Sequence, residues 1–86
     1  MKYVINQAYG GYSLPEDFCG IYGIEDPWDD YDLYRKDDRL IKYVEEHPSG
    51  DLKVMEIPDN ATDWERLEYD GMESIIVVID GKIHYL

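Results

Sequence analysis

Two Asp-Gly dipeptides near the C-terminal end of the chain constrain its fold more than any other feature. Asp70-Gly71 and Asp80-Gly81 separate three runs rich in β-branched and aromatic residues, over residues 64–69, 73–79 and 82–86. Asp-Gly is typical of the type I′ turn, which joins two antiparallel strands through two residues that both need positive φ angles. The sequence therefore predicts a β-meander in the last third of the chain.

The middle run of this meander contains a stretch, Ile75 to Ile79, made only of isoleucine and valine. A short β-branched run bounded by glycine turns favours a strand over a helix, and its lack of polar residues favours burial on both faces. We expect it to be the central strand of the sheet. Residues 2–6 and 52–57 have a similar strand character and predict two further strands.

The segment Ser13-Leu-Pro-Glu16 has the pattern of a helix N-terminus. Ser13 would be the N-cap, Glu16 would complete a capping box three residues later, and Pro15 would lie in the first turn, where its missing N–H costs nothing. We expect a short helix that runs to about Cys19 and ends at Gly20.

A second helix is predicted after Asp37 or Asp38, either of which is a suitable N-cap. Pro48 follows His47 and cannot continue a helix, so we expect the helix to end there. Its apolar stripe consists of Leu40, Ile41 and Val44. Together the elements predict an α+β fold, a single domain over residues 1–86 with two short helices against a mainly antiparallel sheet of about four to five strands.

The chain carries 20 acidic and eight basic residues, a formal net charge of −12. Such a surface repels nucleic acid and anionic membranes and attracts basic partners. One acidic stretch interleaves aromatic residues, contains no base, and has no cap or turn that accounts for its acids. We predict that this stretch binds a partner through Glu25, Asp26, Trp28, Asp29, Asp30, Tyr31 and Asp32.

Candidate zinc ligands are few. Cys19, His47 and His84 show neither CxxC nor HxxxH spacing, although with one carboxylate they would suffice for zinc if the fold gathered them. The competing interpretation buries Cys19 in the core, pairs His47 with its own helix C-terminus and leaves His84 on an edge strand. We expect no cofactor, and zinc stays open as the alternative.

A calcium loop is a weaker alternative. Asp26, Asp30, Asp32 and Asp37 match four ligand positions of the EF-hand loop, but Tyr31 occupies the position that requires glycine.

Catalysis and export are both disfavoured. A thiol nucleophile needs an activating base, and Cys19 with two histidines forms no recognisable catalytic pattern. We therefore expect a protein that is not an enzyme. A single cysteine cannot form an internal disulfide, the N-terminus lacks a signal-peptide pattern, and the longest apolar run is far shorter than the ~20 residues that span a bilayer. We expect a cytoplasmic protein.

The opening Lys2-Tyr-Val-Ile-Asn-Gln-Ala-Tyr-Gly-Gly-Tyr-Ser-Leu14 resembles the start of a set of small, mostly uncharacterised phage and prophage proteins. Residues 38–46, 52–59 and 64–71 follow the order of the same family, so the resemblance covers most of the chain. The C-terminal end departs from it, since family members commonly close with a His-Arg-x-Trp-like tail. The resemblance implies a phage origin, and small acidic phage proteins are often inhibitors of host defence, including anti-CRISPR proteins.

Charge and resemblance together predict an acidic phage inhibitor of the anti-CRISPR type. It would mimic nucleic acid, occupy the basic nucleic-acid-binding surface of a host RNA-guided nuclease, and impede guide or DNA loading. The alternative is a small metal-stabilised or structural phage protein without catalytic function.

Overall fold

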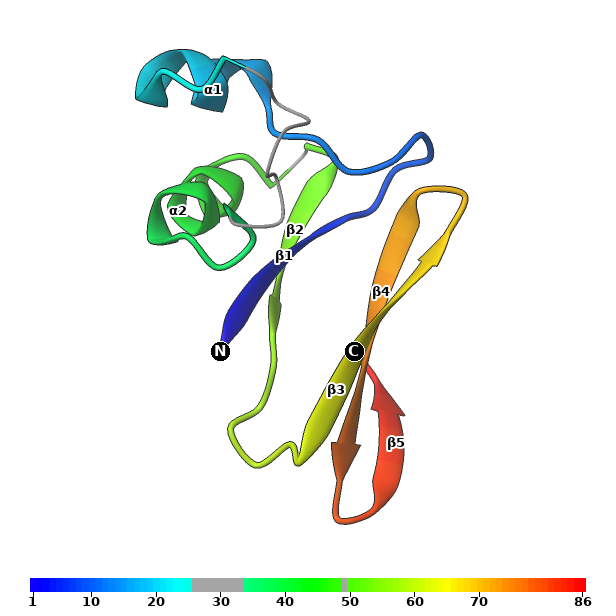
Figure 1. Cartoon of the computed structure of the whole chain (residues 1–86). Helices are drawn as coiled ribbons and strands as arrows, with labels where there is room; N and C mark the ends of the chain where they lie inside the picture. The colour runs from blue at the N-terminus through cyan, green and yellow to red at the C-terminus, as the bar shows by residue number, and fades with distance from the viewer. Residues whose placement is uncertain (26–33, 49) are drawn as a thin grey trace.

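The computed structural model describes residues 1–25, 34–48 and 50–86. These residues form two α-helices and five strands, with every strand pair antiparallel, so the predicted α+β class is confirmed (Figure 1). In chain order the elements are β1 (Lys2–Asn6), α1 (Glu16–Tyr22), α2 (Asp38–Glu46), β2 (Leu52–Glu56), β3 (Asp63–Tyr69), β4 (Met72–Ile79) and β5 (Lys82–Tyr85).

The strands form two sheets. β1 pairs with β2, with Val4 opposite Val54, and β3, β4 and β5 form a three-stranded meander in chain order. The Asp-Gly turns have the predicted conformation, because Asp70 and Asp80 have φ angles of 51° and 52° and the glycines after them 85° and 75°. The meander is confirmed, and the single sheet expected from the sequence is instead split in two.

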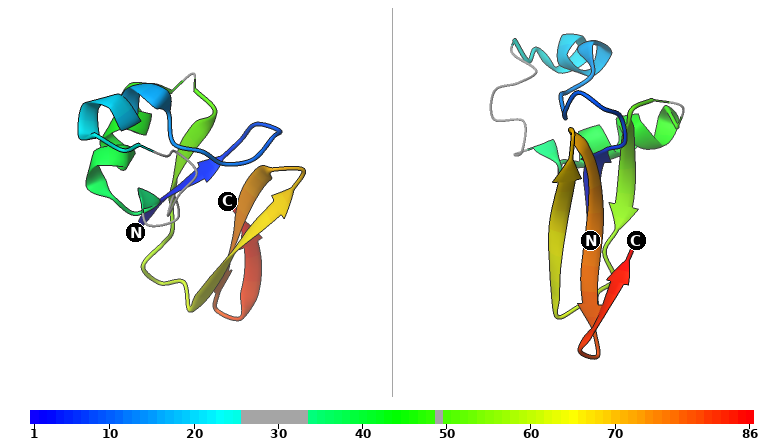
Figure 2. Two further views of the ribbon diagram at one scale, coloured as in Figure 1. Left: turned by 45° about the horizontal axis from the view of Figure 1, so that its top comes forward. Right: turned by 90° about the vertical axis from the view of Figure 1, so that its right-hand side faces the viewer.

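The molecule has three layers: the helices, the β1–β2 sheet and the β3–β4–β5 sheet (Figures 1 and 2). Alternation along β1 explains this order, because Val4 points to the helices and its neighbour Ile5 points to the meander. A first core therefore lies between the helices and β1–β2, and a second lies between the two sheets. The second core contains Ile5, Met55, Ile57, Ile75 and Val77.

Strand β4 is central in its sheet, as expected, but the prediction that both of its faces are buried is wrong. Ile75 and Val77 are fully buried against β1–β2, whereas Ile76 and Val78 on the other face are only half-buried. The physical reason is that a short β-branched run specifies a strand without specifying how many layers cover it. The meander is the last layer, so its outer face is exposed.

Helix α1 begins and ends later than the sequence indicated. Its N-cap is Pro15 in an extended conformation, with no side-chain cap, so the proposed capping role of Ser13 is wrong. The helix passes through Gly20 and ends after Tyr22, where Gly23 adopts a left-handed conformation with φ 69°. Left-handed backbone at the residue after a helix is the usual reason for a C-terminal glycine.

Helix α2 agrees with its prediction. The Asp37 carboxylate accepts a hydrogen bond from the Arg39 N–H at 2.8 Å, and His47 is the C-cap before Pro48. The predicted stripe of Leu40, Ile41 and Val44 is buried in the first core. No helix in the described part of the chain is long and apolar enough to cross a membrane.

Candidate protein-interaction surface

The predicted partner-binding stretch is described at one end only. Glu25 has an exposed side chain. The remaining six residues lie outside the described part of the chain: Asp26, Trp28, Asp29, Asp30, Tyr31 and Asp32. Their predicted role stays a prediction.

Both flanks of this stretch are fixed to the folded body. The Ile24 N–H donates to the Cys19 carbonyl at 2.9 Å, and the Ile24 side chain packs against the first core. On the other flank, the Tyr34 and Phe18 rings meet edge to face with centroids 6.3 Å apart. Arg35 then enters the interior and is 1 % exposed. The acidic stretch is therefore flanked on both sides by residues that packing holds in place.

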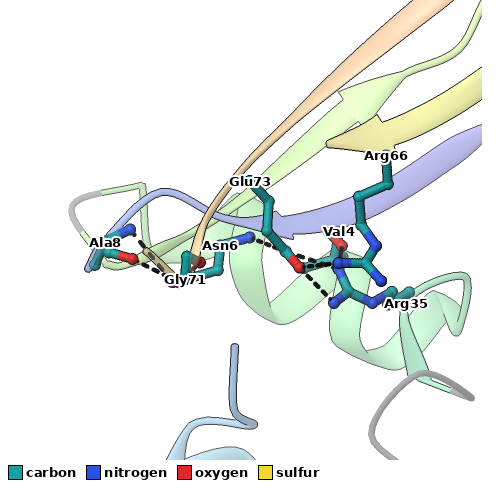
Figure 3. A network of polar contacts seen from close by, with 7 residues as sticks. All are labelled: Val4, Asn6, Ala8, Arg35, Arg66, Gly71 and Glu73. Carbon is teal, nitrogen blue, oxygen red and sulfur yellow. Dashed lines mark hydrogen bonds and ion pairs between the residues drawn. The ribbon is translucent and has the colours of Figure 1, made fainter. Parts of the chain in front are cut away.

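Arg35 is the centre of a buried polar network (Figure 3). Its Nη1 and Nη2 donate to Oε1 and Oε2 of Glu73 at 2.9 and 2.8 Å, a bidentate ion pair. Arg66 Nη1 donates to the same Oε2 at 2.6 Å. The Arg35 guanidinium also lies over the Tyr12 ring, 3.9 Å from its centroid. Two cations thus share one buried carboxylate, and an aromatic face stabilises one of them.

The network also closes the free edge of β1. There the Val4 carbonyl accepts from Arg35 Nη1 at 2.9 Å, and the Val4 N–H donates to the Arg35 carbonyl at 2.9 Å. Two residues along, the Asn6 N–H donates to Glu73 Oε1 at 2.8 Å. Polar groups from a loop and from β4 therefore replace the strand that would otherwise pair with β1, and they tie the two sheets together.

The ionisation of Glu73 reflects two opposing effects. Burial alone disfavours the carboxylate and would raise the pKa of Glu73. Hydrogen bonds from Arg35 and from the Asn6 amide, with the positive charges of Arg35 and Arg66, outweigh burial and hold the pKa of Glu73 below its ordinary value. The carboxylate is therefore charged in the folded protein at neutral pH.

Asn6 completes this junction between the sheets. Its Nδ2 donates to the carbonyls of Gly71 and Ala8, both at 2.7 Å. A Cβ atom at Gly71 would lie 2.1 Å from the backbone nitrogen of Gly11, so only glycine fits where the β3–β4 turn meets the loop after β1. Gly71 thus serves both the turn conformation and this close approach.

Most of the basic side chains that the structure describes form ion pairs with carboxylates of the same chain. Besides Arg35 and Arg66, three bases contact carboxylates: Lys2 with Glu45 at 3.1 Å, Arg39 with Asp37 at 2.9 Å, and Lys42 with Glu46 at 4.0 Å. Among the residues that the structure describes, five bases thereby form ion pairs with four acids. The hydrogen bond from Arg39 holds the pKa of Asp37 below its usual range, with burial opposing it. The surface outside these pairs is predominantly acidic.

The three weak metal candidates lie on different elements. Cys19 is buried in α1, and His84 is exposed on β5. His47 stacks on Tyr43 with centroids 4.1 Å apart, and its Nδ1 contacts the Tyr43 carbonyl at 2.7 Å. That contact is the helix C-terminal role considered for His47. Within residues 1–25, 34–48 and 50–86, no group of three or more His, Cys, Asp or Glu is positioned to hold a metal ion.

The calcium alternative has only one described member. Asp37 uses its carboxylate to cap α2 and to bind Arg39. Its predicted companions Asp26, Asp30 and Asp32 lie outside the described residues.

A hollow of about 310 Å³ near the C-terminal end of α2 brings Ser13, His47 and Asp51 to one lining. These residue types occur in hydrolase triads, where a carboxylate orients the histidine through Nδ1. Here Nδ1 of His47 contacts the Tyr43 carbonyl at 2.7 Å instead. The geometry therefore offers no support for a triad.

Sequence reasoning missed Arg35 and Glu73. A signal existed, because Glu73 shares the face of Ile75 and Val77 in the two-residue period of β4. A carboxylate on the buried face of a strand needs a positively charged partner, and the sequence pattern does not say which of the eight basic residues supplies it.

No family model matches this chain, and no curated protein or solved structure matches it either. The resemblance to small phage proteins stays a prediction.

Proposed function

We propose that this protein is a phage-encoded anti-CRISPR inhibitor that binds the basic nucleic-acid-binding surface of a host RNA-guided nuclease in the cytoplasm. Binding would impede the loading of guide or target DNA. The observation that supports this proposal is the surplus of carboxylates over basic side chains on the surface. Most of the basic side chains that the structure describes already form ion pairs with carboxylates of the same chain.

The negative net charge of the protein indicates which kind of partner it binds. A channel that holds nucleic acid is lined with Lys and Arg, and its counterions are released when a polyanion enters. This protein has a net charge of −12, so it presents negative charge as nucleic acid does, but it carries no nucleobases. Nucleic acid itself would be repelled, so the partner is a protein.

The proposed contact residues are the predicted acidic stretch. Asp26, Asp29, Asp30 and Asp32, with Glu25 beside them, would meet Lys and Arg, while Trp28 and Tyr31 would anchor between them. The packed flanks at Ile24 and Tyr34 support this assignment, because fixed ends lower the entropy that binding must remove. The phage resemblance supports the choice of a host defence nuclease.

The test is DNA cleavage by a panel of purified RNA-guided nucleases, with the protein added before guide, before DNA or after DNA. We expect inhibition near equimolar ratio when the protein is added before the nucleic acid with which it competes. The variant D26N/D29N/D30N/D32N should lose most of this inhibition, because it removes the four central charges.

The matched control is E16Q/D38N/D51N/E56Q, which removes four exposed charges elsewhere and leaves the same net charge as the first variant. It should inhibit nearly as well as the unmodified protein. Equal losses in both variants would show that bulk charge matters and the acidic stretch does not. Uninhibited cleavage across the panel would refute the proposal.

A further inference from the structure

The outer face of the three-stranded sheet is an uncovered, largely apolar surface. The strand register places alternate residues of β3, β4 and β5 on it, while the opposite face contributes Trp64, Ile75 and Val77 to the second core. Its principal apolar members are Tyr69, Met72, Ile76, Val78, Ile83 and Tyr85.

Several large apolar side chains on this face are exposed to solvent, and an exposed apolar patch is more informative than a single exposed residue. Tyr69 and Tyr85 are 76 % and 77 % exposed, and Ile83 is 63 % exposed. Tyr85 lies opposite Ile76 and Ile83 lies opposite Val78, and both β4 residues are half-buried, whereas Tyr69 lies opposite Met72 beside the β3–β4 turn. Contiguous exposed apolar side chains of this kind mark interaction sites in monomeric proteins.

Charge on the face has one sign. Asp63 and Glu65 alternate onto it from β3, and both are exposed. None of the residues that the register places on this face, at 63, 65, 67, 69, 72, 74, 76, 78, 83 and 85, is Lys or Arg. An apolar surface bordered only by acids complements apolar groups that are bordered by bases.

We propose that this outer face docks a segment of a partner protein in which Arg or Lys residues flank apolar side chains. The inference rests on the proposed function in taking the partner to be basic, and it adds the surface that supplies apolar contact. The two tyrosines are the anchors, since Tyr combines a large rigid contact area with a π face for Arg.

The chain itself already uses this recognition chemistry. The Arg35 guanidinium lies 3.9 Å from the Tyr12 ring centroid, and the Arg39 guanidinium lies 4.9 Å from that of Tyr22. Tyr69 and Tyr85 present equivalent rings to solvent. An incoming arginine would therefore find the same kind of stacking surface on the open sheet.

A second copy of this chain is a poorer occupant than a basic segment. Two molecules of charge −12 repel each other, and face-to-face packing would enclose Asp63 and Glu65 of both copies in one interface. A basic segment brings the opposite charge to the same carboxylates.

The experiment is an NMR titration of the isotope-labelled full chain with a synthetic peptide that alternates arginine and leucine. A peptide with glutamine in place of arginine is the control ligand. We expect shift changes centred on Tyr69, Met72, Ile76, Ile83 and Tyr85, and much weaker binding of the glutamine peptide. Changes confined to other parts of the chain would overturn the proposal.

A pair of variants makes the test independent of folding. Y69S/Y85S alters two exposed rings and should weaken peptide binding at least about tenfold while leaving the amide spectrum folded. Y9S is the matched control, because Tyr9 is 70 % exposed in the loop after β1, and it should bind normally. Equal affinity for the double variant and the unmodified protein would refute docking on this face.

The two proposals fail separately. If Y69S/Y85S inhibits the nuclease as well as the unmodified protein does, docking on the sheet is refuted and the proposed function stands. If the peptide binds the sheet and no nuclease is inhibited, the proposed function is refuted and the docking surface stands. Sedimentation showing a dimer that Y69S/Y85S dissolves would assign the face to a second copy and overturn the proposal.

Discussion

Replacing Glu73 with glutamine is the sharpest test of how this fold is held together. The substitution keeps the shape of the side chain and removes its charge. It removes the carboxylate charge that Glu73 supplies to the Arg35 guanidinium, which is 1 % exposed. It also turns one carboxylate oxygen into an NH₂ group, which faces the donors of Arg35 or Arg66 that now contact Glu73 at 2.6 to 2.9 Å.

The expected loss is large relative to the stability of the domain. Removing one partner of a buried ion pair costs about 3–5 kcal/mol. A domain of 86 residues has a free energy of unfolding of about 4–13 kcal/mol, at ~0.05–0.15 kcal/mol per residue. E73Q should therefore lose about a quarter or more of its stability. At a urea slope of ~1–3 kcal/mol/M the unfolding midpoint falls by at least about 1 M.

Urea unfolding followed by circular dichroism and tryptophan fluorescence measures this loss. The control is E45Q, which breaks the Lys2–Glu45 pair at 3.1 Å, where both side chains are about half exposed. That change should stay within about 0.5 kcal/mol. Similar midpoints for E73Q and E45Q would refute the role assigned to the buried network.

A double variant separates the ion pair from its second role. Replacing both partners of a buried pair with apolar residues is often neutral. In R35M/E73M, however, the Val4 carbonyl and the Asn6 N–H lose the partners that they have at 2.9 and 2.8 Å. Buried backbone groups without partners cost about 1–3 kcal/mol each. We expect the double variant to remain destabilised, and full recovery would contradict closure of the β1 edge by these side chains.

Three further outcomes follow from the same contacts. Folding lowers the pKa of Glu73 from an ordinary value of 4.5, so the stability that its carboxylate contributes is complete above pH 4.5 and is lost as the pH falls through the lower pKa of the folded state. Unfolding measured as a function of pH in the acid range should show this loss, and E73Q should show less of it. G71A should cost more than G81A by melting temperature, since both positions have positive φ but only a Cβ at Gly71 would meet backbone, 2.1 Å away. D37A should cost about 0.5–2 kcal/mol in urea unfolding through loss of the α2 cap, and an unchanged midpoint would show that the cap is not needed.

The parts of the fold that follow from local chemistry could be predicted from the sequence. The Asp-Gly turns need positive φ at both positions, and Asp37 with Pro48 delimits α2, because turn conformation and capping depend on a few neighbouring residues. The start of α1 shows the limit of such rules. A serine two residues before Pro15 matched a capping box, yet the helix starts after the proline.

The contacts between layers could not be predicted. Ile75 to Ile79 indicate a strand, but the number of layers around a strand is decided by residues far away in the sequence, and here the outer face stays open. In the same way, Arg35 and Glu73 are 38 residues apart, and no local pattern joins them. Composition indicated that acids exceed bases, whereas only the structure shows that most bases are engaged with carboxylates.

The most direct test of the central claim is competition between this protein and target DNA for the nuclease. A purified, guide-loaded RNA-guided nuclease is first mixed with increasing amounts of the protein, a fluorescent target DNA is then added, and anisotropy reports the DNA that binds. At about 50 mM salt we predict that DNA binding is blocked, and at about 500 mM salt a much weaker competition, because screening shortens the reach of the carboxylates. DNA that still binds at saturating protein, or a competition curve that does not change with salt, would contradict the claim that the acidic surface replaces nucleic acid.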